Sequence, residues 1–567
     1  MEFQSMKRMY LVPGVLAVAA LAACGGGDIN IQPSTNVSNS NNTTNSGGGS
    51  GPSAECASYT NSGGQTIAGT FDGTNCTYSP AFADAGNNLT VDLTIPALAS
   101  GGAHIFEGSL FVGETFDTDA DLAAAGIAQG GDGPVLTIEA GATLAWQSSQ
   151  NFLIVNRGSQ VFAVGRADAP ITFTSTTDLD LTGQNPGPGN GTVGATDVQQ
   201  WGGIVINGFS ITNRCAYTGS IAGGDLATVD CHVDAEGAAG LDESQYGGDV
   251  LDDSSGRLEY VVVKHTGATV GNGDELNGIS FSGVGSNTIV QNLQVYSTFD
   301  DGIEMFGGNF DITNFVALYV RDDSIDIDEG YSGTITNALV IQNEDDGNHC
   351  IEADGIGGFS GLTSQAVEDI IAQGINSRPT INNLTCIISP NGAITATHDP
   401  GAGWRLREGI FPTINDSQVI SFNSAADTTV GNDNYCLRID NRSQQAALDG
   451  DLVLNNIVYA CEEQTRGQTF PDGTTTELAF ASATGAFATL TGASNPTASA
   501  DTDLQLLEGA PPYFSIEANA ISVDGANPGL TPTTTYIGGI ALSITDWTTD
   551  WTYGLQDPNR GVALWFE

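Results

Sequence analysis

The sequence predicts an all-β fold, a single right-handed parallel β-helix with lateral loops, one short loop helix and a C-terminal cap. Asn292, Asn314 and Asn337 lie 22 and 23 residues apart, and an apolar strand surrounds each of them. Pairs of aspartates keep the same step, at 300–301, 322–323 and 345–346. Glycine is frequent, 74 of 567 residues, and only 14% of residues are charged, which excludes a helical bundle. A repeat of this length without a helical period is typical of a solenoid whose turns of chain stack on one another.

The N-terminal 54 residues predict export and a tether. Residues 1–23 contain a basic start at Lys7 and Arg8, a short apolar stretch and small residues before Cys24, as a signal peptide does. The motif LAAC at 21–24 resembles the bacterial lipoprotein box, which implies cleavage before Cys24 and lipidation of its thiol. Residues 24–54 are rich in Gly, Ser and Asn, and we expect a flexible linker.

The remaining cysteines agree with an oxidising compartment. They are even in number, which favours disulfides over metal binding, and no CxxC motif occurs. Eight cysteines permit 105 pairings, of which we favour the consecutive one because it closes short loops. The predicted pairs are Cys56–Cys76, Cys215–Cys231, Cys350–Cys386 and Cys436–Cys461.

The folded part divides into three segments. Residues 55–90 form a disulfide-stapled N-terminal segment, residues 91–480 the β-helix, and residues 481–567 the last turns and a capping segment. Helical periodicity is best between 356 and 378, which predicts a short helix in a lateral loop. A cap is expected after 481 because a solenoid must cover the apolar end of its last turn.

Several strings resemble a family of bacterial secreted and lipid-anchored right-handed β-helix proteins. They are QWGGIVINGFSI (200–211), DELNGISFSGVGSNTIVQNLQVYSTFDDGIEMFGG (274–308), DDSIDIDEGYSGTITNALV (322–340) and WRLREG (404–409). The resemblance covers most of residues 90–567 and implies the fold. It implies no reaction, because none is established for the group.

The repeat also predicts a charged row on the outside of the coil. Where an aliphatic residue of a short strand points inward, the next residue points outward. Superposing the turns of chain gives an outward row of Glu304, Asp326, Glu352, Arg407 and Arg438. The residues two positions further on form a second row of Phe306, Asp328, Asp354, Gly409 and Asp440.

The carboxylates of these rows predict a calcium site. The proposed ligands are Asp326, Asp328, Glu352 and Asp354, with Glu304 beside them. Calcium takes six to eight oxygen ligands, and stacked carboxylates repel one another unless a cation lies between them. The alternative is a solvated acidic face without an ion, and the paired aspartates are turn residues first.

The arginines leave two enzymatic alternatives open. Arg407 and Arg438 with Glu352 resemble in type the layout of a calcium-dependent polysaccharide lyase, although arginine is a poor base. A glycosidase with paired carboxylates is the other possibility. The expected ligand-contacting residues are Trp404 and Tyr331, which could stack on sugar rings, and His349.

Charge restricts the partners. The formal net charge is −51, which excludes nucleic acid as a ligand. Together with the lipoprotein box, this leads us to expect a lipid-anchored protein of the outer membrane, facing the periplasm or the cell surface, that binds an extended glycan or another envelope protein. The competing functions are a polysaccharide lyase or glycosidase and a structural adhesin or coat protein.

Overall fold

The computed structural model describes residues 56–84, 86–181, 189, 191–236, 244–270, 274–389, 401–421, 434–461, 463–487, 516–517, 536–541, 546–556 and 564–565. All of these belong to one compact unit, Pro52–Glu567. The predicted signal peptide, Cys24 and the linker lie outside the described residues. Within the part of the chain described, no helix is long and apolar enough to cross a membrane.

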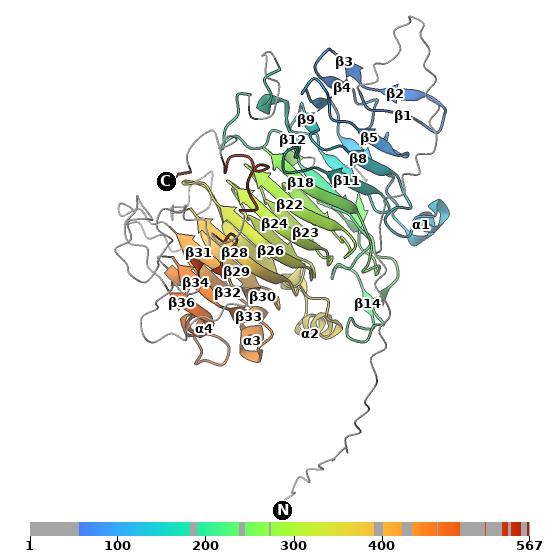
Figure 1. Cartoon of the computed structure of the whole chain (residues 1–567). Coiled ribbons are helices and arrows are strands. Elements are labelled where there is room, and N and C mark those ends of the chain that lie inside the picture. Colours follow the sequence, from blue (N-terminus) through green and yellow to red (C-terminus); the bar gives the residue numbers. More distant parts are fainter. Residues whose placement is uncertain are drawn as a thin grey trace, which may run out of the picture. The chain divides into compact units, whose positions relative to one another are not determined.

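Two large sheets built almost entirely from parallel pairs dominate the structure (Figure 1). The 10-stranded sheet contains, in spatial order, β35 (Glu463–Thr465), β32 (Tyr435–Ile439), β29 (Ala402–Arg407), β27 (His349–Asp354), β25 (Ile325–Asp328), β23 (Ile303–Phe306), β21 (Ile279–Ser282), β13 (Ile204–Asn207), β10 (Leu153–Val155) and β7 (Leu110–Val112).

The 18-stranded sheet contains, in chain order, β3 (Thr70–Phe71), β4 (Cys76–Tyr78), β5 (Leu93–Ile95), β6 (His104–Phe106), β8 (Val135–Ile138), β9 (Thr143–Trp146), β11 (Gln160–Val164), β12 (Ile171–Ser175), β18 (Gly256–Lys264), β22 (Ile289–Tyr296), β24 (Asp311–Leu318), β26 (Thr334–Ile341), β28 (Thr380–Ile388), β30 (Thr413–Asn415), β31 (Gln418–Ser421), β33 (Val453–Asn455), β34 (Ile457–Ala460) and β36 (Gly485–Phe487).

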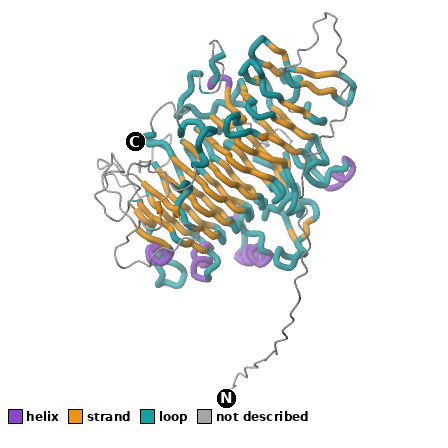
Figure 2. Tube along the Cα trace, in the orientation of Figure 1, coloured by secondary structure: helices purple, strands orange, loops and turns teal. Residues whose placement is uncertain are grey.

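Short antiparallel pairs and helices decorate these sheets, and the helices lie outside the stacked strands (Figure 2). The pairs are β1 (Ser58–Thr60) with β2 (Thr66–Ala68), β14 (Tyr217–Thr218) with β15 (Ala227–Thr228), β16 (Val233–Asp234) with β17 (Gln245–Tyr246), β19 (Thr269–Val270) with β20 (Asp274–Glu275), and β37 (Ile516–Glu517) with β38 (Tyr536–Ile537). The helices are α1 (Asp119–Ala125), α2 (Ser364–Gln373), α3 (Arg442–Asp449) and α4 (Glu477–Thr484), with 3₁₀ turns η1 (Thr176–Asp178) and η2 (Phe359–Gly361).

Successive strands alternate between the two sheets, so each repeat of the sequence contributes to both. Strands β21, β23, β25 and β27 lie side by side in the smaller sheet, and β22, β24, β26 and β28 in the larger one. Alternate side chains such as Ile303, Met305 and Phe315 are fully buried in one continuous core. The all-β prediction is confirmed, and burial of each such apolar side chain contributes roughly 1.5–3 kcal/mol.

The repeated asparagines form a ladder at a bend within the strands. Asn314 Nδ2 donates to Asn292 Oδ1 at 2.9 Å, and Asn337 Nδ2 donates to Asn314 Oδ1 at 3.0 Å. Their φ angles are 53°, 62° and 57° in chain order, and asparagine tolerates this left-handed conformation better than most residues. The step of 22 and 23 residues seen in the sequence therefore stacks equivalent asparagines on neighbouring strands.

All four predicted disulfides are present, as Cys56–Cys76, Cys215–Cys231, Cys350–Cys386 and Cys436–Cys461. The predicted loop helix is α2. Thr363 caps its first turn by accepting a hydrogen bond from Ala366 N, and Gly374 ends it at a φ of 77°. Three further helices, α1, α3 and α4, were not predicted, because each has only seven or eight residues, which is about two turns and gives few repeats of an apolar position.

The larger sheet begins with β3 and β4, before residue 91, where the sequence predicts the start of the β-helix. Most of the predicted cap, residues 481–567, lies outside the described residues, so the cap stays a prediction. The described residues 536–541 and 546–556 pack on the larger sheet, where Ile540 and Leu555 join a buried cluster with Leu339.

Candidate functional site

The register of the 10-stranded sheet produces a charged row on its outer face. Glu304 pairs with Asp326, Asp326 with Glu352, Glu352 with Arg405, and Arg405 with Arg438. The residues that flank them along each strand point inward and are buried. The predicted row is therefore present, except that Arg405 lies where Arg407 was predicted.

The position predicted for Arg407 belongs to Arg405. Trp404 pairs with Ile351 and Leu437, so the strand β29 is shifted by two residues relative to the prediction. Arg407 pairs with Asp354 in the second row, where Gly409 was expected. A shift of two residues preserves which side chains point inward, so the alternation of the sequence could not reveal it.

Carboxylates crowd together where the aspartate turns meet the row. Oxygen atoms of Asp301, Asp323 and Asp326 all lie within 4.8 Å of one another, and so do those of Asp300, Asp301 and Asp322. Asp326 Oδ1 is buried without a hydrogen-bond partner. We call Asp300, Asp301, Glu304, Asp323 and Asp326 the acidic half of the face.

Backbone contacts hold these turns in place. Asp301 Oδ1 accepts from Asp323 N at 3.0 Å, and Asp323 Oδ1 accepts from His349 N at 2.6 Å, so each carboxylate binds the next turn of chain. Asp322 Oδ1 accepts from Asn348 Nδ2 at 2.7 Å. The expectation that the aspartate pairs serve the turns is confirmed for these residues.

Burial and mutual repulsion disfavour the charged forms in the acidic half. Burial raises the pKa of Asp300 to about 8, with Glu236 and Asp322 adding repulsion. Burial, and then the charges of Asp326 and Asp300, raise the pKa of Asp301 well above its usual range. The pKa values of Glu304, Asp323 and Asp326 are raised for the same reasons. A proton or a cation must therefore neutralise part of this charge.

Ion pairs neutralise the other half of the face. Arg405 Nη1 lies 2.8 Å from Glu352 Oε1, and Arg407 Nη2 lies 3.1 Å from Glu352 Oε2. Arg407 Nε also pairs with Asp354, and Arg438 Nε lies 2.6 Å from Asp440 Oδ2. The paired half of the face consists of Glu352, Asp354, Arg405, Arg407, Arg438 and Asp440.

These pairs change the predicted roles of the site residues. Although burial opposes it, the hydrogen bond and charge of Asp354 raise the pKa of Arg407 further above its already high value. Asp440 does the same for Arg438. Both guanidinium groups stay charged, so neither Arg407 nor Arg438 fits the predicted role of a base. Despite burial, His349, Arg407 and Arg405 hold the pKa of Glu352 below its usual range.

Of the predicted calcium ligands, only Asp326 and Glu352 belong to the compact groups. Glu352 lies with Asp323 and His349 rather than with Asp326. Glu304 Oε2 accepts from Asn277 Nδ2 at 2.6 Å, and Asp328 Oδ1 accepts from Glu329 N at 2.5 Å. Asp301 and Asp323, and not Asp328 and Asp354, lie in one group with Asp326, because turns of neighbouring repeats fold against the strand.

The predicted sugar-stacking residues lie inside the protein. The side chains of Trp404 and Tyr331 are 0% exposed, and Tyr331 Oη donates to Phe310 O at 2.8 Å. Neither ring can stack on an external ligand. Each occupies an inward position of the core, which explains its aromatic character without a ligand.

His349 links Asp323 of the acidic half to Tyr435 through a chain of hydrogen bonds that the sequence did not reveal. Its Nδ1 lies 2.8 Å from Asp323 Oδ1, and its Nε2 lies 2.9 Å from Tyr435 Oη. Burial lowers the pKa of His349 to about 4, so the imidazole is neutral at pH 7. The Asp323 carboxylate accepts a hydrogen bond from the Nδ1–H of His349. This leaves Nε2 to accept a hydrogen bond from the Tyr435 hydroxyl.

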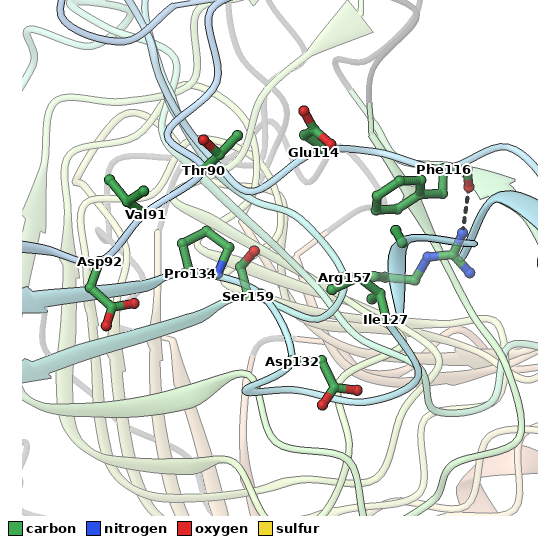
Figure 3. A pocket seen from close by; sticks show the side chains of 12 residues that line it. Thr90, Val91, Asp92, Glu114, Phe116, Ile127, Asp132, Pro134, Arg157 and Ser159 are labelled. Atoms are coloured by element: carbon green, nitrogen blue, oxygen red, sulfur yellow. Dashed lines mark hydrogen bonds between the residues drawn. The ribbon is translucent and has the colours of Figure 1, made fainter. Parts of the chain in front are cut away.

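A cavity of about 300 Å³ lies elsewhere, near the N-terminal strands (Figure 3). Val91, Phe116 and Ile127 contribute apolar walls, and Arg157 reaches its edge. The guanidinium of Arg157 already donates to the carbonyl oxygens of Phe116, Cys231 and Gly247. Asp92, Glu114 and Asp132 also line the cavity, which therefore combines apolar and acidic side chains with an arginine whose guanidinium is already hydrogen-bonded.

Comparison with known proteins gives one match. The model of the pectate-lyase-like β-helix domain family matches residues 115–503, more than half of the chain, and this range contains both halves of the charged face. No curated protein and no solved structure matches the chain. The chain therefore belongs to the family of pectate-lyase-like β-helix domains.

Proposed function

We propose that the protein binds an acidic polysaccharide along the outer face of the 10-stranded sheet, with calcium held by Asp301, Asp323 and Asp326. The observation that carries this proposal is the register that continues the acidic half directly into the paired half. We also infer that the two parallel sheets are walls of one right-handed coil, because successive strands alternate between them.

The dimensions of the face suit an extended chain. The row crosses the neighbouring strands β23, β25, β27, β29 and β32. At about 4.8 Å between strands, it spans roughly 20 Å, the length of a short oligosaccharide.

Charge decides which polysaccharide fits. A net charge of −51 repels a polyanion unless divalent ions bridge the two. Three protein carboxylates leave several of calcium's six to eight oxygen positions open, and the carboxylates of uronic acid units would fill them. Arg405, Arg407 and Arg438 keep about a quarter of their side-chain surface exposed, at 24%, 24% and 28%. They can share hydrogen bonds with the same ligand.

The test compares polygalacturonate with a neutral glucan, in millimolar calcium and in chelator. We expect binding to polygalacturonate only, and only with calcium. Asp326→Asn should weaken it at least tenfold, whereas Asp168→Asn, an exposed carboxylate outside the face, should leave it unchanged. Equal binding in chelator, or equal binding to both glycans, would refute the proposal.

A calcium-dependent lyase is the second candidate, because the neutral His349 lies between the carboxylate cluster and Tyr435. In this alternative the His349–Tyr435 pair, and not Arg407, accepts the proton removed beside the uronate carboxylate. Incubation with polygalacturonate and calcium should then release unsaturated uronates with new ultraviolet absorbance. His349→Gln should abolish that release while glycan binding persists, and the absence of product with wild-type protein would leave binding as the function.

We also propose that the protein acts outside the cytoplasm, tethered to the outer membrane through a lipid on Cys24. The disulfides support an oxidising compartment. Replacement of Cys24 by alanine should release the protein from the membrane fraction of the producing cell into the soluble fraction. If the protein stays in the membrane fraction after this change, the anchor is not at Cys24.

A further inference from the structure

A second cluster of reactive groups lies under the C-terminal segment, at the end of strand β18 in the larger sheet. Lys264, the last residue of β18, places its Nζ 2.8 and 3.0 Å from the two carboxylate oxygens of Asp178, at the end of η1. Both side chains are 0% exposed. The ring of Tyr553 covers the ammonium, with Nζ 3.4 Å from the ring centroid.

The carboxyl group of Asp178 is surrounded by donors. Thr174 Oγ1 donates to its Oδ2 at 2.7 Å, and Gly189 N donates to its Oδ1 at 3.1 Å. Such donors stabilise negative charge on an oxygen when a nucleophile adds to the carbon between them. The amine of Lys264 is the nucleophile within reach.

His265 is aimed at the same carboxyl group. Its Nδ1 lies 2.7 Å from Asp197 O, and because a carbonyl only accepts, Nδ1 carries the proton. Nε2 lies 3.4 Å from Asp178 Oδ1, and this nitrogen is buried without a hydrogen-bond partner in a side chain that is 1% exposed. A proton on Nε2 would point at Asp178 Oδ1, so the imidazole is placed to accept and return a proton at this carboxyl group.

We propose that Lys264 and Asp178 form an intramolecular amide bond in the folded protein, with His265 transferring the protons. The Lys264 ammonium gives one proton to His265, and the free amine adds to Asp178 Cγ. The bond between Cγ and one carboxylate oxygen then breaks. That oxygen leaves as water, with one proton returned by His265 and one from the nitrogen. The charges of ammonium and carboxylate disappear together, and one water is the only other product.

Burial favours this outcome over a lasting ion pair. Burial lowers the pKa of the Lys264 amine, because an ammonium without water is costly. Removal of both charges from the interior eliminates the desolvation cost that a buried ion pair retains. The product would link β18 to the turn after the adjacent strand β12, beneath the C-terminal segment.

Peptide mapping with trypsin tests the proposal on the wild-type protein. An unmodified Lys264 is cleaved and yields the peptide 258–264. We expect instead one species in which 167–214 is linked to 258–321, with a mass lower than their sum by one water. Neither peptide contains cysteine, so disulfides do not interfere. Cyclisation of an aspartate alone also loses water, but leaves Lys264 cleavable.

The variants sharpen the result. Lys264→Met should abolish the linked species, and His265→Gln should lower its yield at least tenfold after refolding from denaturant. Recovery of the free peptide 258–264 as the main product of the folded wild type would overturn the proposal. An undiminished yield in His265→Gln would overturn the role of the histidine.

Discussion

The two halves of the charged face use the same strands and the same register, but they balance charge differently. In the paired half, Arg405 and Arg407 lie against Glu352 and Asp354. In the acidic half, no described lysine or arginine forms an ion pair with Asp301, Glu304 or Asp326. The comparison shows that a parallel stack aligns like charges as readily as opposite ones. Where it aligns like charges, an external proton or cation must complete the site.

The largest expected effect on stability comes from removing an arginine of the paired half. Arg407→Ala leaves Glu352 and Asp354 without one of their cations in a mostly buried setting, and we expect a loss of about 2 kcal/mol in the free energy of unfolding. Urea denaturation measures it. Arg166→Ala, which removes an exposed pair with Asp168, should change stability by less than about 0.5 kcal/mol. Equal effects of the two changes would show that the pairing does not stabilise the face.

Alkaline pH should weaken the acidic half when calcium is absent. Asp300 has a folded pKa of about 8 against 3.8 for its ordinary value, so the folded state holds a proton that the unfolded state has lost. Stability is therefore complete below the ordinary value and falls as pH rises toward 8. From pH 6.5 to 8, a single such group costs about 1.5 kcal/mol.

The lower limit of pH 6.5 separates this effect from that of the histidines. His104 and His349 have pKa values lowered to about 4, mainly by burial, so they destabilise the fold mostly below their ordinary value of 6.5, and each costs only about 0.4 kcal/mol at pH 6.5. Thermal unfolding in chelator at pH 6.5, 7.2 and 8 should show falling stability. A flat profile over that range would contradict the protonation of the acidic half.

The smallest expected effect comes from replacing one carboxylate of the acidic half by a neutral side chain. Asp326→Asn removes one repelling charge next to Asp323 and Glu352, and we expect the calcium-free protein to gain about 0.5–1 kcal/mol. The same variant should lose the increase in melting temperature that calcium gives the wild type. Asp168→Asn should show neither change. A calcium response that survives in Asp326→Asn would place the ion elsewhere.

The features that depend on the spacing of the repeat could be predicted. The step of 22 to 23 residues placed Asn292, Asn314 and Asn337 in one ladder, and it aligned Glu304 with Asp326. Short separations along the chain also favoured the consecutive disulfides, which are present.

The features that depend on longer insertions could not be predicted. Between β27 and β29 the chain makes an excursion through α2 and β28, so the repeat no longer fixes the register. Trp404 and Leu406 both point inward, and the pattern could not decide which of them follows Ile351. The contact of His349 with Tyr435 joins residues 86 positions apart, and no local pattern encodes it.

A crystal structure of the protein grown with calcium at pH 8 tests the central claim most directly. The account predicts one ion within about 2.3–2.6 Å of carboxylate oxygens from Asp301, Asp323 and Asp326. An empty cluster at saturating calcium, with these carboxylates in their present positions, would contradict it.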